Sequence, residues 1–350
     1  MARIYVGGAG GAPSNGFIRS LRDSRRKDYL IGASSSPTDL FLANVDEMHP
    51  VPSARDPNYI AAVTKLWTQT KPDFVHVQHD YEVQAVSRLR PQLAEMGIKT
   101  YLPDATTIDN CVDKLKSYDI WQAAGVNVAQ TMLLRDEADV DTAFKKWGPK
   151  VWIRAIEGAG GAGALPTDNP SFAKTWISHF NGWGKFTASE LLSKETVTWL
   201  SIWHEGELVV AQGRKRLSWT FGDRTLSGAT GVPGVGQTYS DPVVDRVAQD
   251  AIAAIDKKPH GIFAVDMTYA FDGRPCVTEI NIGRFFTTHY FFTKAGLNMP
   301  EIYCDIALEG KFPNLPKKIN PLPDDLLWIR GMDSEPVLIP LQKLKDLVGK

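Results

Sequence analysis

The chain has 350 residues, of which 43% are hydrophobic and 23% charged, and 39 basic against 40 acidic residues leave a formal net charge of −1. This length suits two or three domains with a sizeable core, and the lack of any basic block argues against binding of nucleic acid or an anionic membrane surface. No run approaches about 18 apolar residues, so no membrane span is expected.

The cysteines and the N-terminus bear on the compartment. Cys111, Cys276 and Cys304 are widely spaced and odd in number, and they form no C-x-x-C pair or Cys/His cluster, so neither a disulfide framework nor a zinc site is predicted. The opening MARIYVGGAGG lacks the long apolar run of a signal peptide. We therefore expect a cytoplasmic protein with reduced thiols.

The first hundred residues alternate between strand and helix patterns. Strands are predicted at 3–7, 73–77 and around 99–102, and helices near 17–21, 60–67 and 83–96. This alternation predicts a parallel sheet with right-handed crossovers, as in a doubly wound α/β domain.

A glycine cluster, Gly7-Gly8-Ala9-Gly10-Gly11, follows the first strand and is similar to a dinucleotide-binding fingerprint. No acidic residue closes a second strand at the expected distance, and Pro13 stands where the helix should begin, so NAD binding is disfavoured. The cluster is then either a tight strand-to-helix turn or one wall of a substrate site.

Ionisable residues gather where the strand at 73–77 ends, namely His76, His79, Asp80 and Glu82. The carboxyl ends of parallel strands are where α/β folds bind ligands. The group is therefore either part of a substrate site or a solvated turn, and the sequence leaves both open.

Beyond about residue 106 the pattern changes to a mixture of helices and hairpins. Helices are predicted at 111–124, 137–147, 171–180 and 241–256, and strands at 128–134, 150–156, 187–192, 197–204 and 207–219. Asp272-Gly273 lies between two β-rich runs, the strongest short hairpin signal in the chain.

A second glycine cluster is better suited to phosphate. The strand Val151–Arg154 runs into a loop whose glycines are Gly158, Gly160, Gly161 and Gly163. Small residues let backbone N–H groups close around an anion, and Arg154 would direct its donors at the same phosphates. No Gly-Lys-Ser/Thr follows, which excludes a Walker A loop. The alternative is a flexible hairpin tip.

The predicted hairpin around Asp272-Gly273 carries a set of oxygen ligands. Asp266 lies on one strand, and Glu279 and Asn281 share a face of the other because they are two residues apart. Two carboxylates and an amide oxygen suit Mg²⁺ that bridges nucleotide phosphates. The alternative is an exposed polar strand face, but the apolar residues between them indicate a core-packed hairpin.

The order of these pieces resembles the ATP-grasp superfamily, in particular ligases similar to the carbamoyl-phosphate synthase large subunit. The resemblance is carried by Asp113-Lys114, Trp152-Ile153-Arg154 with its glycine loop, Asp266, and Glu279-Ile280-Asn281. It implies a Rossmann-like pre-ATP-grasp domain at 1–106 and a two-lobed ATP-grasp domain at 107–350, with a small lobe near 120–190 and a large lobe near 191–320. The fold class is thus α/β followed by α+β.

The resemblance also implies residue roles. Lys114 and Arg154 would hold the ATP phosphates under the glycine loop, Glu190, Leu191 and Leu192 would hold adenine, and Glu195 would face the ribose, since Val197 replaces the family's usual acid. The metal would be bound by Asp266, Glu279 and Asn281. Arg284, one position later than usual, would face the transferred phosphoryl group, and Arg214 and Arg216 would face the substrate or the phosphates.

The activity implied by the resemblance is that of an ATP-dependent carboxylate-amine ligase. Its cofactors would be ATP and Mg²⁺, its partners a small-molecule carboxylate and amine, without nucleic acid or membrane, and a homodimer is compatible with it. Two alternatives share the ATP site: a small-molecule kinase, and a nucleotide-binding protein without catalysis. The full set of metal-binding oxygens speaks against the second.

Overall fold

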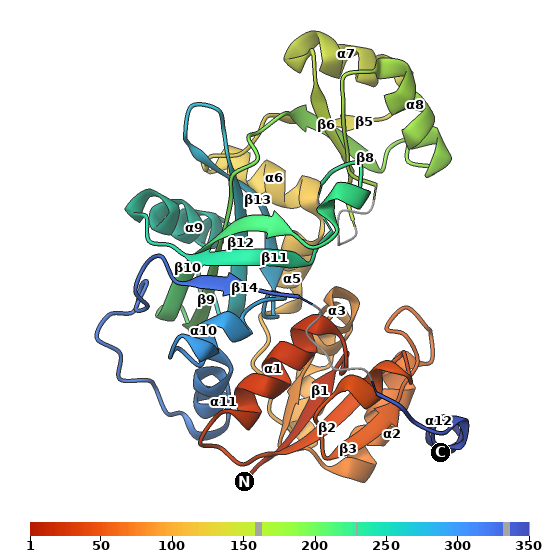
Figure 1. Cartoon of the computed structure of the whole chain (residues 1–350), viewed down its shortest axis with the longest axis vertical. Helices are drawn as coiled ribbons and strands as arrows, with labels where there is room; N and C mark the ends of the chain where they lie inside the picture. Colours follow the sequence, from red (N-terminus) through yellow and green to blue (C-terminus); the bar gives the residue numbers. More distant parts are fainter. Residues whose placement is uncertain (158–162, 229, 332–336, 350) are drawn as a thin grey trace.

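The N-terminal part of the chain forms a parallel sheet. The computed structural model describes residues 1–157, 163–228, 230–331 and 337–349, and within these ranges it contains three sheets flanked by helices (Figure 1). The first sheet has the order β3-β2-β1-β4, with all neighbouring strands parallel. Its elements are β1 (Arg3–Gly7), α1 (Ala12–Arg22), β2 (Tyr29–Ser34), η1 (Asp39–Leu42), β3 (Glu47–Pro50), α2 (Tyr59–Thr70), β4 (Phe74–His76), α3 (Asp80–Arg88) and α4 (Arg90–Glu95).

The prediction of a parallel α/β unit is confirmed, but its strands differ in detail. β2 and β3 were not predicted, because one is a six-residue strand after a charged segment and the other a four-residue edge strand. The strand expected around 99–102 is reduced to a single bridge between Phe74 and Lys99. The helix expected at 83–96 is two helices, because Pro91 stands in the first turn of the second.

The first glycine cluster is a tight turn between β1 and α1. Gly8 and Gly10 have φ values of 62° and 93°, and a Cβ on Gly10 would lie 1.9 Å from the carbonyl oxygen of Asp39. Only glycine accommodates both the positive φ and this close approach. Pro13 lies in the first turn of α1, a position that proline tolerates because no intrahelical N–H bond is lost there.

A small antiparallel sheet of order β5-β8-β6-β7 follows and carries two helices. In Figure 1 it stands at the top, away from the other sheets. Its elements are β5 (Thr131–Leu134), α7 (Glu137–Trp147), β6 (Val151–Ala155), β7 (Leu165–Thr167), α8 (Pro170–His179) and β8 (Phe186–Glu190). The bounds of α7 are those predicted, since its apolar residues recur at helical spacing and Val140 and Ala143 are buried.

The largest sheet has six strands in the order β13-β12-β9-β10-β11-β14. The helix expected at 111–124 is divided at Asp113, which caps the second half by accepting hydrogen bonds from the N–H groups of Leu115 and Lys116. The elements of this part are α5 (Ala105–Val112), α6 (Lys114–Ala123), β9 (Thr196–His204), β10 (Glu207–Trp219), η2 (Gly222–Arg224), β11 (Pro233–Thr238), α9 (Pro242–Ile255), β12 (Gly261–Tyr269), β13 (Pro275–Ile282), α10 (Tyr290–Lys294) and α11 (Met299–Glu309).

The C-terminal segment after α11 completes the large sheet. Its strand β14 (Leu327–Ile329) pairs antiparallel with β11. The last helix, α12 (Leu341–Val348), contacts β3 of the first sheet, where Leu347 is buried. Figure 1 shows that the chain therefore ends beside the N-terminal sheet.

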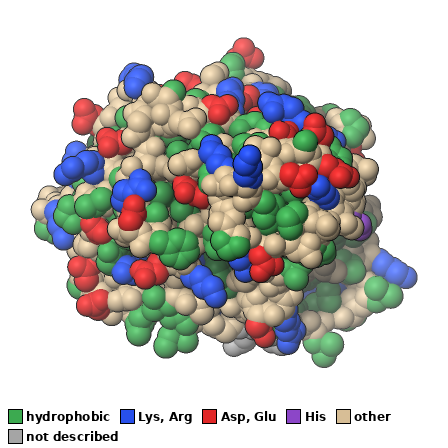
Figure 2. All heavy atoms as spheres, turned by 90° about the horizontal axis from the view of Figure 1, so that it is seen from above, with side chains coloured by type: hydrophobic (Ala, Val, Ile, Leu, Met, Phe, Trp, Pro, Cys, Tyr) green, Lys and Arg blue, Asp and Glu red, His purple; other side chains and the backbone are tan. Residues whose placement is uncertain are grey.

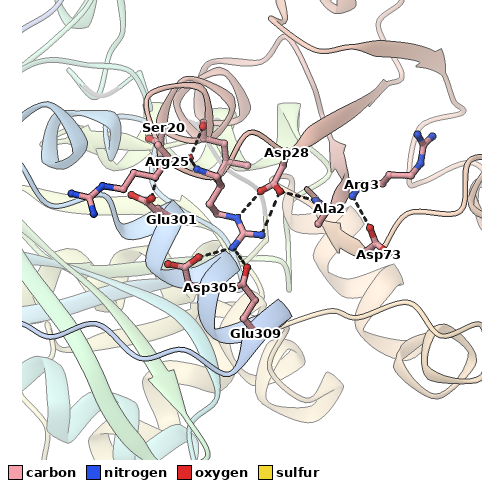
Figure 3. Close-up of polar contacts among 12 residues, drawn as sticks. Ala2, Arg3, Ser20, Arg25, Asp28, Asp73, Glu301, Asp305 and Glu309 are labelled. Atoms are coloured by element: carbon pink, nitrogen blue, oxygen red, sulfur yellow. Dashed lines mark hydrogen bonds and ion pairs between the residues drawn. The ribbon is translucent and has the colours of Figure 1, made fainter.

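A buried arginine joins the N-terminal unit to α11. Arg26 contacts Asp28 at 2.6 Å and also Asp305 and Glu309 on α11 at 2.5 and 2.8 Å. Figure 3 shows these three acids converging from the two parts of the chain. The side chains of Arg26 and Asp28 are 8% and 3% exposed, whereas that of Glu309 is 55% exposed. The pair with Asp28 is therefore expected to contribute more to the free energy of unfolding than the pair with Glu309.

Two neutral imidazoles lie in the same interface. His76 at the end of β4 stacks on Phe17 of α1 at 3.9 Å between ring centroids, and its Nδ1 lies 3.3 Å from the hydroxyl of Tyr303 on α11. His289 lies over Gly16, where a Cβ would be 2.8 Å from its ring. Burial lowers the pKa of His76 to about 3 and that of His289 to about 4.

The surface carries no concentration of one charge on the face shown in Figure 2, where acidic and basic side chains are interspersed. This distribution agrees with the formal net charge of −1. None of the helices in the described ranges is long and apolar enough to cross a membrane.

Candidate active site

The β12–β13 hairpin brings the predicted metal ligands together. Asp266 pairs directly with Glu279 across the two strands, and Asn281 lies two residues further along β13. A bulge next to this pair is closed by the Thr278 hydroxyl, which donates to the carbonyl oxygen of Asp266. The turn residue Gly273 has a φ of 85°, as a tight hairpin requires. Asp266, Glu279 and Asn281 therefore lie on one face of the sheet, as predicted.

Asp266 is already engaged by neighbouring side chains. Its Oδ1 accepts hydrogen bonds from Arg216 at 2.8 Å and from the Thr198 hydroxyl, and its Oδ2 accepts from the amide of Asn281 at 3.2 Å. Glu279 is the more open carboxylate, with its side chain 35% exposed and the ammonium of Lys114 at 3.7 Å. No cluster of three His, Cys, Asp or Glu side chains suited to a metal occurs in the described part of the chain.

The oxygen donors nevertheless fit Mg²⁺ of the kind that bridges nucleotide phosphates. Such an ion takes only one or two protein carboxylates and fills its remaining positions with waters and phosphate oxygens. Glu279 offers an accessible carboxylate, and the amide oxygen of Asn281 lies on the same face.

Two arginines project from β10 beside the hairpin. Arg214 is 1% exposed and donates to the hydroxyls of Thr198, at 2.8 Å, and Thr288. Burial and, to a smaller extent, the charge of Arg216 lower its pKa to about 9, and the charge of Asp266 opposes this change. The Nε atoms of both arginines are buried without a hydrogen-bond partner in the described chain. Each arginine thus has an Nε–H group that donates to no acceptor in the described chain.

Lys114 and Arg154 approach the hairpin from outside the large sheet. Lys114 begins α6, and Arg154 lies on β6 of the small sheet. The guanidinium of Arg154 donates to the carbonyl oxygen of Thr278 at 3.0 Å. Burial lowers the pKa of Arg154, while the charge of Glu279 opposes that effect. The two cations predicted to bind phosphates therefore both lie near Glu279.

Arg284 reaches the same face although it lies one position later than the resemblance predicts. Its Nη2 donates to the Oδ1 of Asn281 at 2.6 Å. The extra residue is taken up by Gly283, whose φ of 69° turns the chain after β13. Asp80 of α3 also binds this arginine, through both carboxylate oxygens. This partner was noted in the sequence, but its partnership with Arg284, 204 positions away, was not predicted.

The structure describes the residues predicted to hold the adenine and the ribose, but only part of the predicted phosphate loop. The carboxylate of Glu190 accepts a hydrogen bond from the backbone N–H of Gln130 at 2.8 Å, Leu191 and Leu192 are half-buried, and Glu195 is exposed. Gly163 has a φ of 74°, whereas Gly158, Gly160 and Gly161 lie outside the described residues. Of the four residues predicted to hold the adenine and the ribose, Glu195 meets the hairpin through its backbone, because its carbonyl oxygen accepts from the N–H of Tyr269 at the end of β12 at 3.0 Å.

Another member of the group at the end of β4 is a buried acid. Glu82 accepts a hydrogen bond from the Tyr59 hydroxyl at 3.1 Å, and burial raises its pKa to about 7. A Cβ on Gly7 would lie 2.9 Å from both carboxylate oxygens, so the glycine turn packs against this acid. Of the ionisable residues in this group, His76 and Glu82 are thus buried, Asp80 is partly buried and His79 is exposed.

Solved structures of similar fold include enzymes complexed with adenine nucleotides. The biotin carboxylase domain of a 2-oxoglutarate carboxylase from Hydrogenobacter thermophilus, solved with MgADP, ADP and bicarbonate, matches 93% of this chain and 73% of its own with a TM-score of 0.69 and 15% identity. N5-carboxyaminoimidazole synthetase from Staphylococcus aureus with ADP matches 89% and 79% with a TM-score of 0.67 and 15% identity. An L-amino acid ligase from Bacillus licheniformis matches 88% and 74% with a TM-score of 0.66 and 14% identity.

These likenesses define the fold of the chain. It has the ATP-grasp fold in the form found in biotin carboxylases, which confirms the predicted fold class. No protein-family model and no curated protein sequence matches the chain. At 14–15% identity to these structures, the activity has to be argued from the site itself.

Proposed function

We propose that the protein is an ATP-dependent ligase that activates a carboxylate as an acyl phosphate for attack by an amine or similar nucleophile. The observation that carries the proposal is the convergence of five cationic side chains on the hairpin face of an ATP-grasp fold. These are Lys114, Arg154, Arg214, Arg216 and Arg284.

The charge balance of this face suits MgATP. The three carboxylates that meet these cations are Asp80, Asp266 and Glu279. Among the described residues the face therefore carries about two excess positive charges, which matches the two negative charges of the magnesium complex of ATP. A face with this surplus attracts the nucleotide and stabilises charge that develops on a transferred phosphoryl group.

The residues divide into two groups by position. Lys114 and Arg154 would bind the ATP phosphates, with the domain at 1–106 and the two lobes at 120–190 and 191–320 enclosing the nucleotide. Glu279, Asn281 and Asp266 would hold Mg²⁺, whose charge neutralises the phosphates when it is bound. Glu190, Leu191 and Leu192 would hold adenine and Glu195 the ribose.

The second group lies where the acceptor carboxylate would enter. Arg214 and Arg216 would orient that carboxylate, and Arg284 would stabilise the phosphoryl group between ADP and acceptor. A carboxylate oxygen bonds to the γ-phosphorus as the bond to ADP breaks. The amine nitrogen then bonds to the carbonyl carbon, phosphate leaves, and the amine loses a proton. Positioning and charge neutralisation supply the catalysis, and no covalent enzyme intermediate is required.

A screen of carboxylate and amine pairs for ADP formation, with mass detection of products, tests the proposal. We expect ADP, phosphate and a condensed product in equal amounts for at least one pair. ADP formation that needs no amine and yields a stable phosphorylated compound would instead identify a small-molecule kinase. Nucleotide binding without ADP formation across the screen would contradict the ligase assignment.

A further inference from the structure

The N-terminal unit contacts the chain immediately after the metal-binding hairpin. The backbone N–H of Phe285 donates to the side-chain oxygen of Gln78 at 2.8 Å. A Cβ on Gly283 would lie 2.8 Å from a methyl group of Val83 on α3. The segment that carries Arg284 is therefore held on both sides by the N-terminal unit, through Gln78 after β4 and Val83 on α3.

Between these two contacts, Asp80 binds Arg284 in a two-pronged arrangement. One carboxylate oxygen accepts from Nε of Arg284, and the other accepts from Nη2 at 3.1 Å. Nη2 also donates to Asn281. Burial alone would raise the pKa of Asp80, but the charge and hydrogen bonds of Arg284 outweigh it and lower that pKa, so the carboxylate is charged. In the described structure this leaves Nη1 as the nitrogen of Arg284 available to a ligand.

We propose that Asp80 is a positioning residue for Arg284, through which the N-terminal unit sets the aim of an arginine at the phosphoryl-transfer centre. This inference rests on the proposed function. A carboxylate that accepts two parallel hydrogen bonds fixes both the position and the plane of a guanidinium group. Because Asp80 begins α3 of the N-terminal unit and Asn281 lies on β13 of the large sheet, the arginine is oriented only when the N-terminal unit and the hairpin are packed together.

Charge and geometry predict opposite effects for the substitution Asp80→Asn. If Asp80 acted only through its charge, the substitution would leave the positive charge of Arg284 without its neutralising carboxylate, and every phosphate ligand would bind more tightly. If Asp80 positions Arg284, the ground-state nucleotide is little affected, while a mimic of the transferred phosphoryl group binds less tightly because its arginine is misdirected.

The test compares the affinity of the full-length protein for MgADP with its affinity for MgADP plus fluoroaluminate, a planar mimic of the phosphoryl group, by calorimetric titration. Wild type should prefer the fluoroaluminate complex. Asp80→Asn should leave the MgADP affinity nearly unchanged and reduce the preference by roughly 10- to 100-fold, the usual range for removing an orienting partner. Asp80→Glu, which keeps the carboxylate, should retain part of the preference.

A matched control is Asp109→Asn. Asp109 also pairs with an arginine of α3, because both of its carboxylate oxygens accept from Nη2 of Arg88, but on the exposed surface. This variant should bind both ligands as wild type does.

Three results would overturn the inference. In the first, Asp80→Asn keeps the full preference for fluoroaluminate. In the second, it binds both ligands more tightly. In the third, it and Asp80→Glu lose affinity for both ligands equally, as expected for a purely structural residue. A wild-type protein without any preference for fluoroaluminate would instead contradict the phosphoryl-transfer function itself, and the inference would fall with it.

Discussion

Replacing Glu279 by glutamine removes the most accessible carboxylate of the hairpin face without changing its size. The effect on folding should be small. The ion pair between Glu279 and Lys114 is 3.7 Å long and involves a side chain that is 35% exposed, a situation worth less than about 1 kcal/mol. Asp266 lies directly opposite on the neighbouring strand, so the substitution also relieves a like-charge repulsion.

The effect on turnover should be large. Glu279 is the carboxylate best placed to hold Mg²⁺ against the phosphates, and its charge is what a glutamine cannot replace. We expect ADP formation with a competent substrate pair to fall by at least ~100-fold, on the order of 2.7 kcal/mol in the barrier. The apparent requirement for Mg²⁺ should rise in the same variant, because one of its ligands has lost its charge.

The assay measures ADP formation as a function of Mg²⁺ concentration, alongside a thermal melt. Glu207→Gln is the matched control, because Glu207 is an exposed acid at the start of β10 in the same sheet, and it should behave as wild type. Wild-type turnover in Glu279→Gln would show that the hairpin is scaffold and that the catalytic centre lies elsewhere. A collapse of the melting temperature would refute the argument that this acid contributes little to folding.

Three further predictions concern phosphate binding, pH and the interface at α11. Arg154→Ala should weaken ATP binding by roughly 1.5–3 kcal/mol, the value of a charge-assisted hydrogen bond, and an unchanged affinity in calorimetric titration would refute its role. The pKa of His289 is about 4 in the folded protein, below the value of about 6.5 in an unfolded chain, so its neutral form stabilises the fold above pH 6.5 and this contribution is lost as the pH falls towards 4. Urea unfolding at pH 7 and pH 5 should therefore show that acid destabilises His289→Gln by about 2 kcal/mol less than wild type. Equal acid sensitivity of the two proteins would be inconsistent with a buried neutral imidazole. Arg26→Met should cost roughly 3–5 kcal/mol of unfolding free energy because it leaves Asp28 buried without its cation, whereas Glu309→Gln, at an exposed end of the same cluster, should cost less than about 1 kcal/mol; similar losses in both variants would contradict this division.

Sequence patterns predicted those elements that are stabilised by residues close to one another in the chain. The helix at 137–147 and the hairpin around Asp272-Gly273 were recovered because helical periodicity and turn chemistry are encoded within a few residues. The strands β2 and β3 were missed because they are short and gain their stability from pairing with β1 and with each other. β14 was missed for the same reason, since its partner β11 lies about 90 positions earlier.

The same distinction applies to the site. Asp266, Glu279 and Asn281 could be placed on one face from strand periodicity alone, since the register of a tight hairpin follows from its turn. The contact between Asp80 and Arg284 could not, because it depends on how the N-terminal sheet packs against the large one. The ionisable group after the strand at 73–77 was the only signal for it in the sequence, and that signal did not indicate a partner.

The most direct test of the account follows the fate of the acceptor carboxylate oxygens. A substrate pair found in the screen is supplied with its carboxylate labelled with heavy oxygen, and the phosphate released during turnover is analysed by mass spectrometry. The account predicts one labelled oxygen in each phosphate, because the acyl phosphate is broken at its carbonyl carbon when the amine attacks. Condensed product accompanied by unlabelled phosphate would show that no acyl phosphate forms and would contradict the proposed reaction.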